Sequence, residues 1–221
     1  GLVDANVAGV RLHLYSADVT EANPTTNAGI MRATDGGILY LQVPVLEQTA
    51  GAELRADGAG SLVKLHDGRI AGGHLATTDG GRIETANFYS TLDGSTSAGA
   101  LTIDSGSVVR VTGTLELRGP IMNLGTIQLD GYSGRIAARN VTLSGGGEVE
   151  MAFDVPSGTQ YRDALIQGTD QNATGRLSNV DNLIHGAGQI GRQQAPIGMG
   201  QSEAIRLSLE NRTGGIIAAD E

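Results

Sequence analysis

Short runs in which apolar and polar residues alternate recur along the middle of the chain. A period of two places the apolar side chains on one side of a β-strand and the polar side chains on the other. The runs therefore predict short strands with apolar residues facing a core and polar residues facing solvent. The predicted inward side chains are Val109, Val111, Leu115, Leu117, Ile127, Leu129, Val141, Leu143, Val149 and Met151.

Breaks that contain glycine separate these runs, for example at residues 104–106, at Gly119-Pro120 and at residues 131–134. Glycine readily adopts the positive φ values that a tight corner requires. Corners of only a few residues leave no room for helices between the strands. The pattern therefore predicts an all-β protein.

Short strands of this kind can pair as antiparallel hairpins in a sandwich or stack as successive coils of a solenoid. Internal repetition favours the solenoid, because residues 27–33 (NAGIMRA) are echoed near the end of the chain by residues 211–218 (NRTGGIIA), with a smaller version at residues 123–127 (NLGTI). Asparagines at such corners could bond to one another along the axis. The alternative is that Asn and Gly mark generic turns.

Coils of roughly 20 residues or more would give about ten coils. At about 4.8 Å per coil, these would form a rod on the order of 50 Å long. We expect residues 1–221 to form one continuous β-helix segment, in which residues 27–210 could be one unit of a longer array and the next unit would start near residue 211.

A few segments fit the repeating pattern poorly. Residues 1–26 and 154–176 fit it least. Residues 161–168 are expected to form a lateral loop or a short helix, and residues 193–201 are expected to leave the stack. Such excursions are where a rod-like protein can carry binding specificity.

The composition agrees with many short strands and turns. The chain has 34 glycines, 3% aromatic residues and no cysteine, which excludes disulfides and thiolate metal sites. A net charge of −9 would repel a nucleic-acid backbone or an anionic membrane surface, so neither is an expected partner. No stretch approaches the roughly 18 apolar residues of a membrane span.

The chain resembles the repetitive passenger regions of autotransporter and filamentous-haemagglutinin-type bacterial surface proteins. The segments that carry the resemblance span most of the chain: residues 27–33, 36–41, 69–75, 113–117, 123–129, 141–147, 179–191 and 211–219. The resemblance implies a right-handed parallel β-helix, export across the cell envelope, and adhesion or surface display. It implies no catalytic residues.

Two sequence motifs suggest nucleotide or acyl-transfer chemistry. Residues 186–191 (GAGQIG) satisfy the dinucleotide-binding pattern G-x-G-x-x-G, but no helix is expected to follow. Ser61 and Lys64 satisfy S-x-x-K, a pair that needs a helical turn to bring its side chains together. On a strand the two side chains would point to opposite faces, so neither motif predicts a site.

Acidic and histidine side chains offer three further candidates. Glu148 and Glu150 would share one face of a strand, with Glu116 and Arg118 one or two coils below. Such a carboxylate pair could serve a glycan hydrolase. A solvated outer face is the favoured interpretation, and no aromatic platform for sugar rings is evident. His66-Asp67 with His74 is the one histidine cluster. Asp-Gly steps could ligate calcium between coils, although turn formation explains them better; they begin at Asp35, Asp57, Asp67, Asp79, Asp93 and Asp130.

The sequence therefore predicts no catalytic, cofactor-binding or metal-binding residues and no enzymatic activity. We expect a structural and adhesive segment of a large secreted or surface-displayed bacterial protein. Its partners would be a host, abiotic or cell-surface ligand such as a glycan, neighbouring repeats of the same polypeptide, and other copies of itself. The alternatives are a self-assembling extracellular filament subunit and a β-helix enzyme that degrades polysaccharides.

Overall fold

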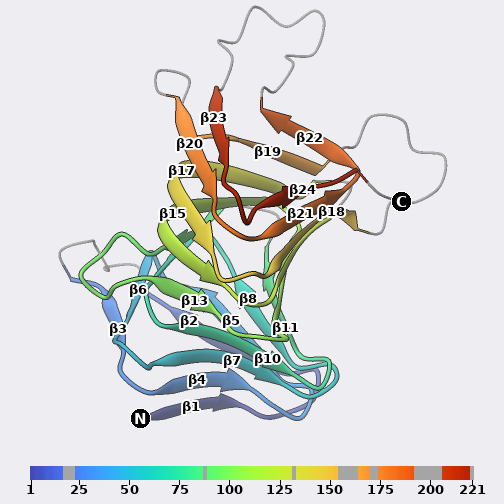
Figure 1. Ribbon diagram of the computed structural model, residues 1–221. Helices are drawn as coiled ribbons and strands as arrows, with labels where there is room; N and C mark the ends of the chain where they lie inside the picture. The colour runs from blue at the N-terminus through green and yellow to red at the C-terminus, as the bar shows by residue number, and fades with distance from the viewer. Residues whose placement is uncertain are drawn as a thin grey trace, which may run out of the picture.

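The computed structural model describes residues 1–16, 23–86, 89–130, 133–153, 164–169, 174–191 and 206–219. These residues form a parallel β-solenoid without any helix, and so without a helix that could cross a membrane. The colour passes steadily from blue at one end of the stack to red at the other, so chain order follows stacking order (Figure 1). The all-β parallel β-helix expected from the sequence is confirmed.

Each coil contributes strands to three faces, which we call faces 1, 2 and 3 in chain order. Face 2 is a separate nine-stranded sheet with one strand from each coil. Its strands are β2 (Arg11–Tyr15), β5 (Ile38–Gln42), β8 (Leu62–Leu65), β11 (Arg82–Thr85), β14 (Val108–Val111), β16 (Thr126–Asp130), β18 (Glu148–Phe153), β21 (Leu183–Gly186) and β24 (Ile216–Ile217).

Faces 1 and 3 belong to one 15-stranded sheet, because β15 (Thr114–Asn123) and β17 (Arg135–Ser144) run through both. The other strands of face 1 are β1 (Leu2–Ala5), β4 (Ile30–Ala33), β7 (Glu53–Asp57), β10 (His74–Thr78), β13 (Leu101–Ile103), β20 (Gly175–Asn179) and β23 (Leu207–Asn211). The other strands of face 3 are β3 (Thr25–Asn27), β6 (Val45–Gln48), β9 (Arg69–Ala71), β12 (Tyr89–Asp93), β19 (Ala164–Gly168) and β22 (Gly188–Gly191).

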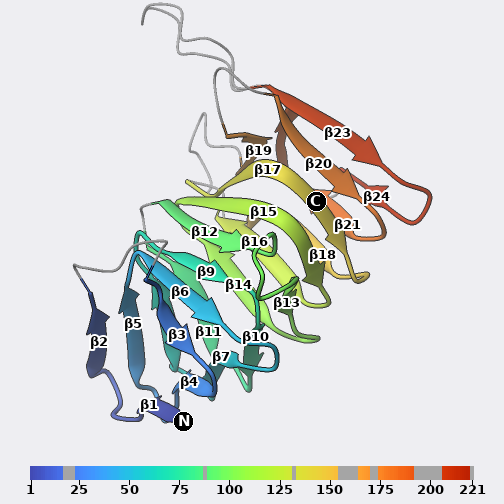
Figure 2. The same ribbon diagram turned by 90° about the vertical axis from the view of Figure 1, so that its left-hand side faces the viewer.

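The strands of each face stack in parallel with varying coil lengths. Val108 pairs with Thr126 across a short coil, whereas Val141 pairs with Leu177 across a much longer one. Neighbouring strands such as β2 and β5 run side by side (Figure 2). The nine strands of face 2, at about 4.8 Å from one to the next, span about 40 Å. Nine strands on this face are somewhat fewer than the roughly ten coils expected.

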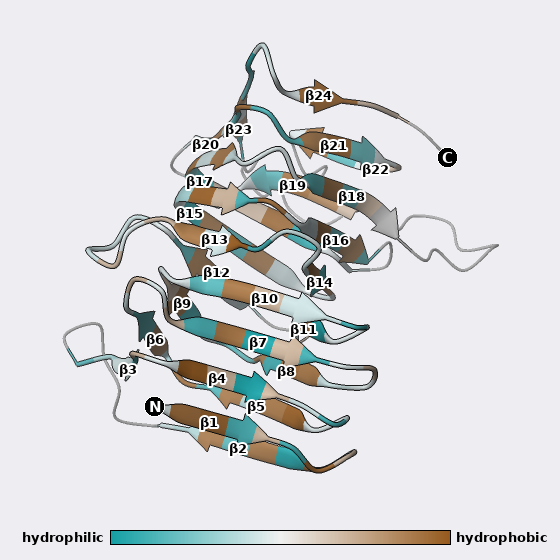
Figure 3. Ribbon diagram, turned by 60° about the horizontal axis from the view of Figure 1, so that its bottom comes forward, coloured by the Kyte–Doolittle hydropathy of each residue, from teal (hydrophilic) through white to brown (hydrophobic). Residues whose placement is uncertain are grey.

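The core is a set of aliphatic ladders that run up the inside of the solenoid. All ten side chains predicted to point inward are buried, none being more than 5% exposed. Apolar and polar residues follow one another along single strands (Figure 3). The inward and outward sides of these strands are therefore as the alternation predicts.

One of the segments that fit the sequence pattern poorly is regular, and one expectation about an irregular segment is wrong. The described part of residues 1–26 belongs to the stack, because β1 and β2 pair with β4 and β5 of the next coil. The helix or lateral loop expected at residues 161–168 is, at residues 164–168, strand β19, which is buried and paired with β17. Residues 193–201 lie outside the described residues.

The echoed segments at residues 27–33 and 211–218 occupy different corners. Asn27 ends β3 on face 3, whereas Asn211 ends β23 on face 1. The two segments share a corner sequence without sharing a place in the coil. The longer array remains a prediction.

Candidate binding surface

The Glu148 and Glu150 side chains lie on the outer side of β18, as the alternation predicts, since Val149 between them is buried. One coil below are Thr126 and Gln128, and Gln128 donates a hydrogen bond of 2.9 Å to Glu150. The expected neighbours Glu116 and Arg118 are instead on face 3, where β15 pairs with β12 and β17. The glutamate pair therefore lacks the companions expected for it.

The two motifs that suggested nucleotide or acyl chemistry lie on or beside strands. Residues 186–191 run from the end of β21 through β22, not through a strand-to-helix turn. Ser61 is buried at a corner, where its hydroxyl accepts a hydrogen bond of 3.0 Å from the Gly36 amide. Lys64 is on the outer side of β8 and pairs with Glu84 at 3.3 Å, so Ser61 and Lys64 do not meet.

The histidine cluster is divided between two faces. His66 follows β8 on face 2, with its Nδ1 3.8 Å from an oxygen of Asp67. His74 begins β10 on face 1, where its Nδ1 lies 2.8 Å from an oxygen of Asp104. Within the described ranges, no group of three or more His, Asp or Glu residues could hold a metal ion.

The Asp-Gly steps serve turn formation at three of the six positions. Asp35, Asp67 and Asp79 have φ values of 53°, 49° and 50°, a conformation that Asp tolerates better than most residues. The turn explanation is confirmed there. Asp57, by contrast, ends β7 in an extended conformation.

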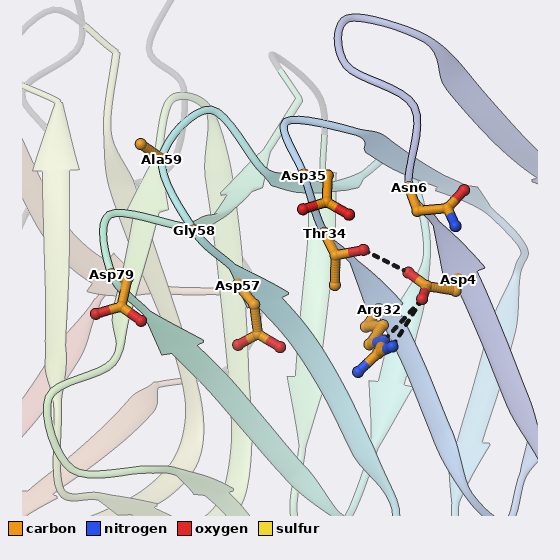
Figure 4. Close-up of a pocket in the computed structure, with 9 residues that line it drawn as sticks. All are labelled: Asp4, Asn6, Arg32, Thr34, Asp35, Asp57, Gly58, Ala59 and Asp79. Atoms are coloured by element: carbon orange, nitrogen blue, oxygen red, sulfur yellow. Dashed lines mark hydrogen bonds and ion pairs between the residues drawn. The ribbon is translucent and has the colours of Figure 1, made fainter.

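An open groove of about 720 Å³ lies over the ends of β1, β4 and β7 (Figure 4). Four aspartates line it, namely Asp4, Asp35, Asp57 and Asp79. Asp4 is paired with Arg32 at 2.8 Å. Partial burial by itself raises the pKa of Asp57, but hydrogen bonds from Thr78 and Arg55 lower it below its usual value. An aspartate held ionised in this way cannot act as a general acid near neutral pH.

The structure gathers a cluster of rings on the outer side of face 2, which the sequence did not reveal. We call it the ring surface; it consists of Arg11, His13, Tyr15, Tyr40, Gln42 and His66 on and beside β2, β5 and β8. Two of the five tyrosines and two of the four histidines of the chain are in it. These rings come from three different coils, which is why no aromatic platform is evident in the sequence.

The strand register holds the rings of the ring surface in place. His13 pairs directly with Tyr40 across neighbouring strands, and their ring centroids are 4.9 Å apart with the planes at 89°. Tyr15 and His66 extend the cluster on either side, with centroids 6.0 Å from His13 and 5.4 Å from Tyr40 respectively. The two contacts of His13 are edge-to-face, and such contacts at these distances are favourable.

Polar groups border these rings. The Arg11 guanidinium lies 4.3 Å from the centre of the Tyr40 ring, a cation–π contact. The Oε1 atom of Gln42 lies 3.1 Å from Nε2 of His13. The Tyr15 side chain remains 64% exposed. Rigid rings beside amide, imidazole and guanidinium groups can bind a ligand that has both an apolar face and hydroxyl groups.

A signal for the ring surface exists in the sequence but requires the coil register. His13 pairs with Tyr40 in the next coil, and Tyr40 pairs with Lys64 in the coil after that. Because the coil length changes from one coil to the next, the spacing alone does not show that these residues are neighbours.

Comparisons of the chain with protein-family models, with curated proteins and with solved structures found no match.

Proposed function

We propose that this chain is a non-catalytic segment of a large secreted or surface-displayed bacterial protein, in which the solenoid is an extended rod that carries a carbohydrate-binding surface. The stacked parallel coils agree with the resemblance to passenger regions at the level of the fold. The location outside the cell and the adhesive role follow from that resemblance.

The observation that carries the proposal is the ring surface. Tyr15, Tyr40 and His13 project from paired strands, so their positions are set by the sheet and not by a loop. A sugar ring has a flat C–H face that packs on an aromatic ring, and its hydroxyl groups can bond to side chains such as Gln42. Binding to side chains that are already ordered costs little conformational entropy.

A self-assembling filament subunit is the second candidate, because parallel coils that stack within one chain can stack in the same way between two copies. Sedimentation that shows growing assemblies with concentration would favour this candidate.

An array of immobilised neutral oligosaccharides tests the proposed function. The chain should bind at least one of them, and Tyr40→Ala and Tyr15→Ala should each weaken that binding about tenfold or more, a loss typical of a central aromatic contact. Met122→Ala, which removes an exposed apolar side chain on face 1, is the matched control and should bind as the unaltered chain does. Absence of binding, or equal losses in all three variants, would overturn the proposal.

A further inference from the structure

Glu116 on face 3 is buried although it points away from the core. It lies between the inward side chains of Leu115 and Leu117 on β15, yet only 2% of its side chain is exposed. The sequence alternation predicts a solvated residue here. The covering groups are polar side chains from its own coil and from the coils on either side.

Three hydrogen bonds hold the Glu116 carboxylate. Arg118 donates from Nε to Oε1 and from Nη2 to Oε2, both at 2.9 Å. The Tyr89 hydroxyl donates to Oε2, also at 2.9 Å. A bidentate arginine and a tyrosine on one buried carboxylate form a rigid unit. Glu116 therefore positions both the Arg118 guanidinium and the Tyr89 ring.

Arg139 lies beside this unit and forms one ion pair among the described residues. Its Nη1 atom is 3.6 Å from Glu116 Oε1, which is an ion pair but too long for a good hydrogen bond. Its side chain is 55% exposed. Within the described part of the chain, Glu116 is the one acidic group in contact with it, and Glu116 is already bonded to Arg118.

Among the described residues around this unit, arginines outnumber carboxylates. Arg135 is exposed on the same side of β17 as Arg139 and forms no ion pair with a described residue. Arg118 and Arg139 both pair with the carboxylate of Glu116. Asp93, the cross-strand partner of Arg118, is bonded to Arg69 and Ser95. On a chain with a net charge of −9, this positive spot attracts an anionic group.

We propose that Arg139, with the Tyr89 ring beside it, binds the carboxylate of an acidic sugar such as a uronic acid. The guanidinium presents parallel donors that match a planar carboxylate. The half-exposed Tyr89 ring provides an apolar surface for the sugar ring. Both groups contact Glu116, one on each carboxylate oxygen, so they lie close enough for one sugar unit.

Two other classes of acidic ligand fit this spot less well. An extended peptide gains affinity by adding a strand at a free sheet edge, but β15 is paired on both sides here, with β12 and β17. A nucleic acid gains its affinity from many phosphate contacts, and Arg135 and Arg139 are the exposed arginines described on this part of β17. The site is on a different face from the ring surface, so it does not depend on the proposed function.

Isothermal titration calorimetry with hexagalacturonate tests this site, and the fully methyl-esterified hexamer is the uncharged counterpart of that ligand. The chain should bind the acid at least tenfold more tightly than the ester, and raised salt should weaken the binding of the acid. Arg139→Ala should abolish the preference, and Arg139→Lys, which keeps the charge but loses the paired donors, should bind less tightly than the unaltered chain.

The controls separate this site from general charge effects and from the ring surface. Arg176→Ala removes an exposed arginine on β20, paired with Glu210, and should leave the preference unchanged. Tyr40→Ala should also leave it unchanged. Equal binding of acid and ester, an equal loss in Arg176→Ala, or tighter binding of a polyglutamate peptide than of the saccharide would overturn the proposal.

Discussion

The side-chain amide of Asn123 donates a hydrogen bond of 3.0 Å to the side-chain oxygen of Asn182, which comes 59 residues later in the chain. Asn182 follows β20 and Asn123 ends β15, and the coil between them passes this corner as Gly145, Gly146 and Gly147. A Cβ atom on Gly147 would lie 2.9 Å from the Asn123 amide nitrogen and 2.6 Å from its carbonyl oxygen. The glycines therefore leave space for two asparagines to bond across an intervening coil.

Asparagine bonding continues up the same corner. Asn179 donates to Asn211 at 2.9 Å and to the Asn182 carbonyl at 2.9 Å. On another corner Asn27 donates to Gln48 at 3.1 Å. The expectation that corner asparagines bond along the axis is confirmed at these positions.

Asn182→Ala should destabilise the chain by about 1–3 kcal/mol, because it removes the buried partner of the Asn123 amide and leaves polar groups unsatisfied. Asn6→Ala, at an exposed corner position, should change stability by about 0.5 kcal/mol or less. Urea denaturation followed by circular dichroism measures both. Similar losses in the two variants would show that the Asn123–Asn182 bond contributes little.

Leu129→Ala should cost about 2–5 kcal/mol, because Leu129 is fully buried in the core ladder of face 2. Gln128→Ala, one position earlier on the outer side, should cost about 1 kcal/mol or less, since it loses one partly exposed hydrogen bond to Glu150. Thermal melts of the two variants compare the two sides of one strand. A larger loss for Gln128→Ala would contradict the observed orientation of β16.

Local alternation predicted the inward side of the strands well, because one buried face fixes the orientation of every residue in a short strand. It did not predict Glu116, because the covering Tyr89 comes 27 residues earlier in the chain and meets it only after the coils stack. The break expected at Gly119-Pro120 is present as a register shift between Arg118 and Gly119, but β15 continues through it. The ring surface was missed for the same reason as Glu116: neighbours across coils depend on coil lengths, which vary.

Burial and the hydrogen bond to Glu116 raise the pKa of Tyr89 to about 12. Since the neutral phenol is the favoured form in the folded chain, this contribution to stability is fully present below about pH 10, the usual tyrosine pKa, and is lost as the pH rises through about 12. The difference in ultraviolet absorbance between the unaltered chain and Tyr89→Phe isolates this one titration. In Glu116→Gln the midpoint pH of the Tyr89 titration should fall. A midpoint near 10 in the unaltered chain would contradict the Tyr89–Glu116 bond.

We expect no turnover of polysaccharides. Glu148 and Glu150 lack the companions expected for them, and Asp57 in the aspartate-lined groove is held in its ionised form. Incubation with a panel of neutral and acidic polysaccharides should produce no new reducing ends and no unsaturated products. Activity that disappears in Asp57→Asn or in Glu148→Gln would favour the polysaccharide-degrading alternative.

In the proposed function, the solenoid binds a saccharide at the ring surface without changing it. Isothermal titration calorimetry with the neutral oligosaccharide that binds best on the array, followed by mass analysis of the recovered saccharide, tests both parts in one sample. We expect one saccharide bound per chain, binding by Tyr40→Ala that is about tenfold or more weaker, and recovery of the saccharide intact. Cleaved saccharide, or binding that Tyr40→Ala leaves unchanged, would contradict the proposed function.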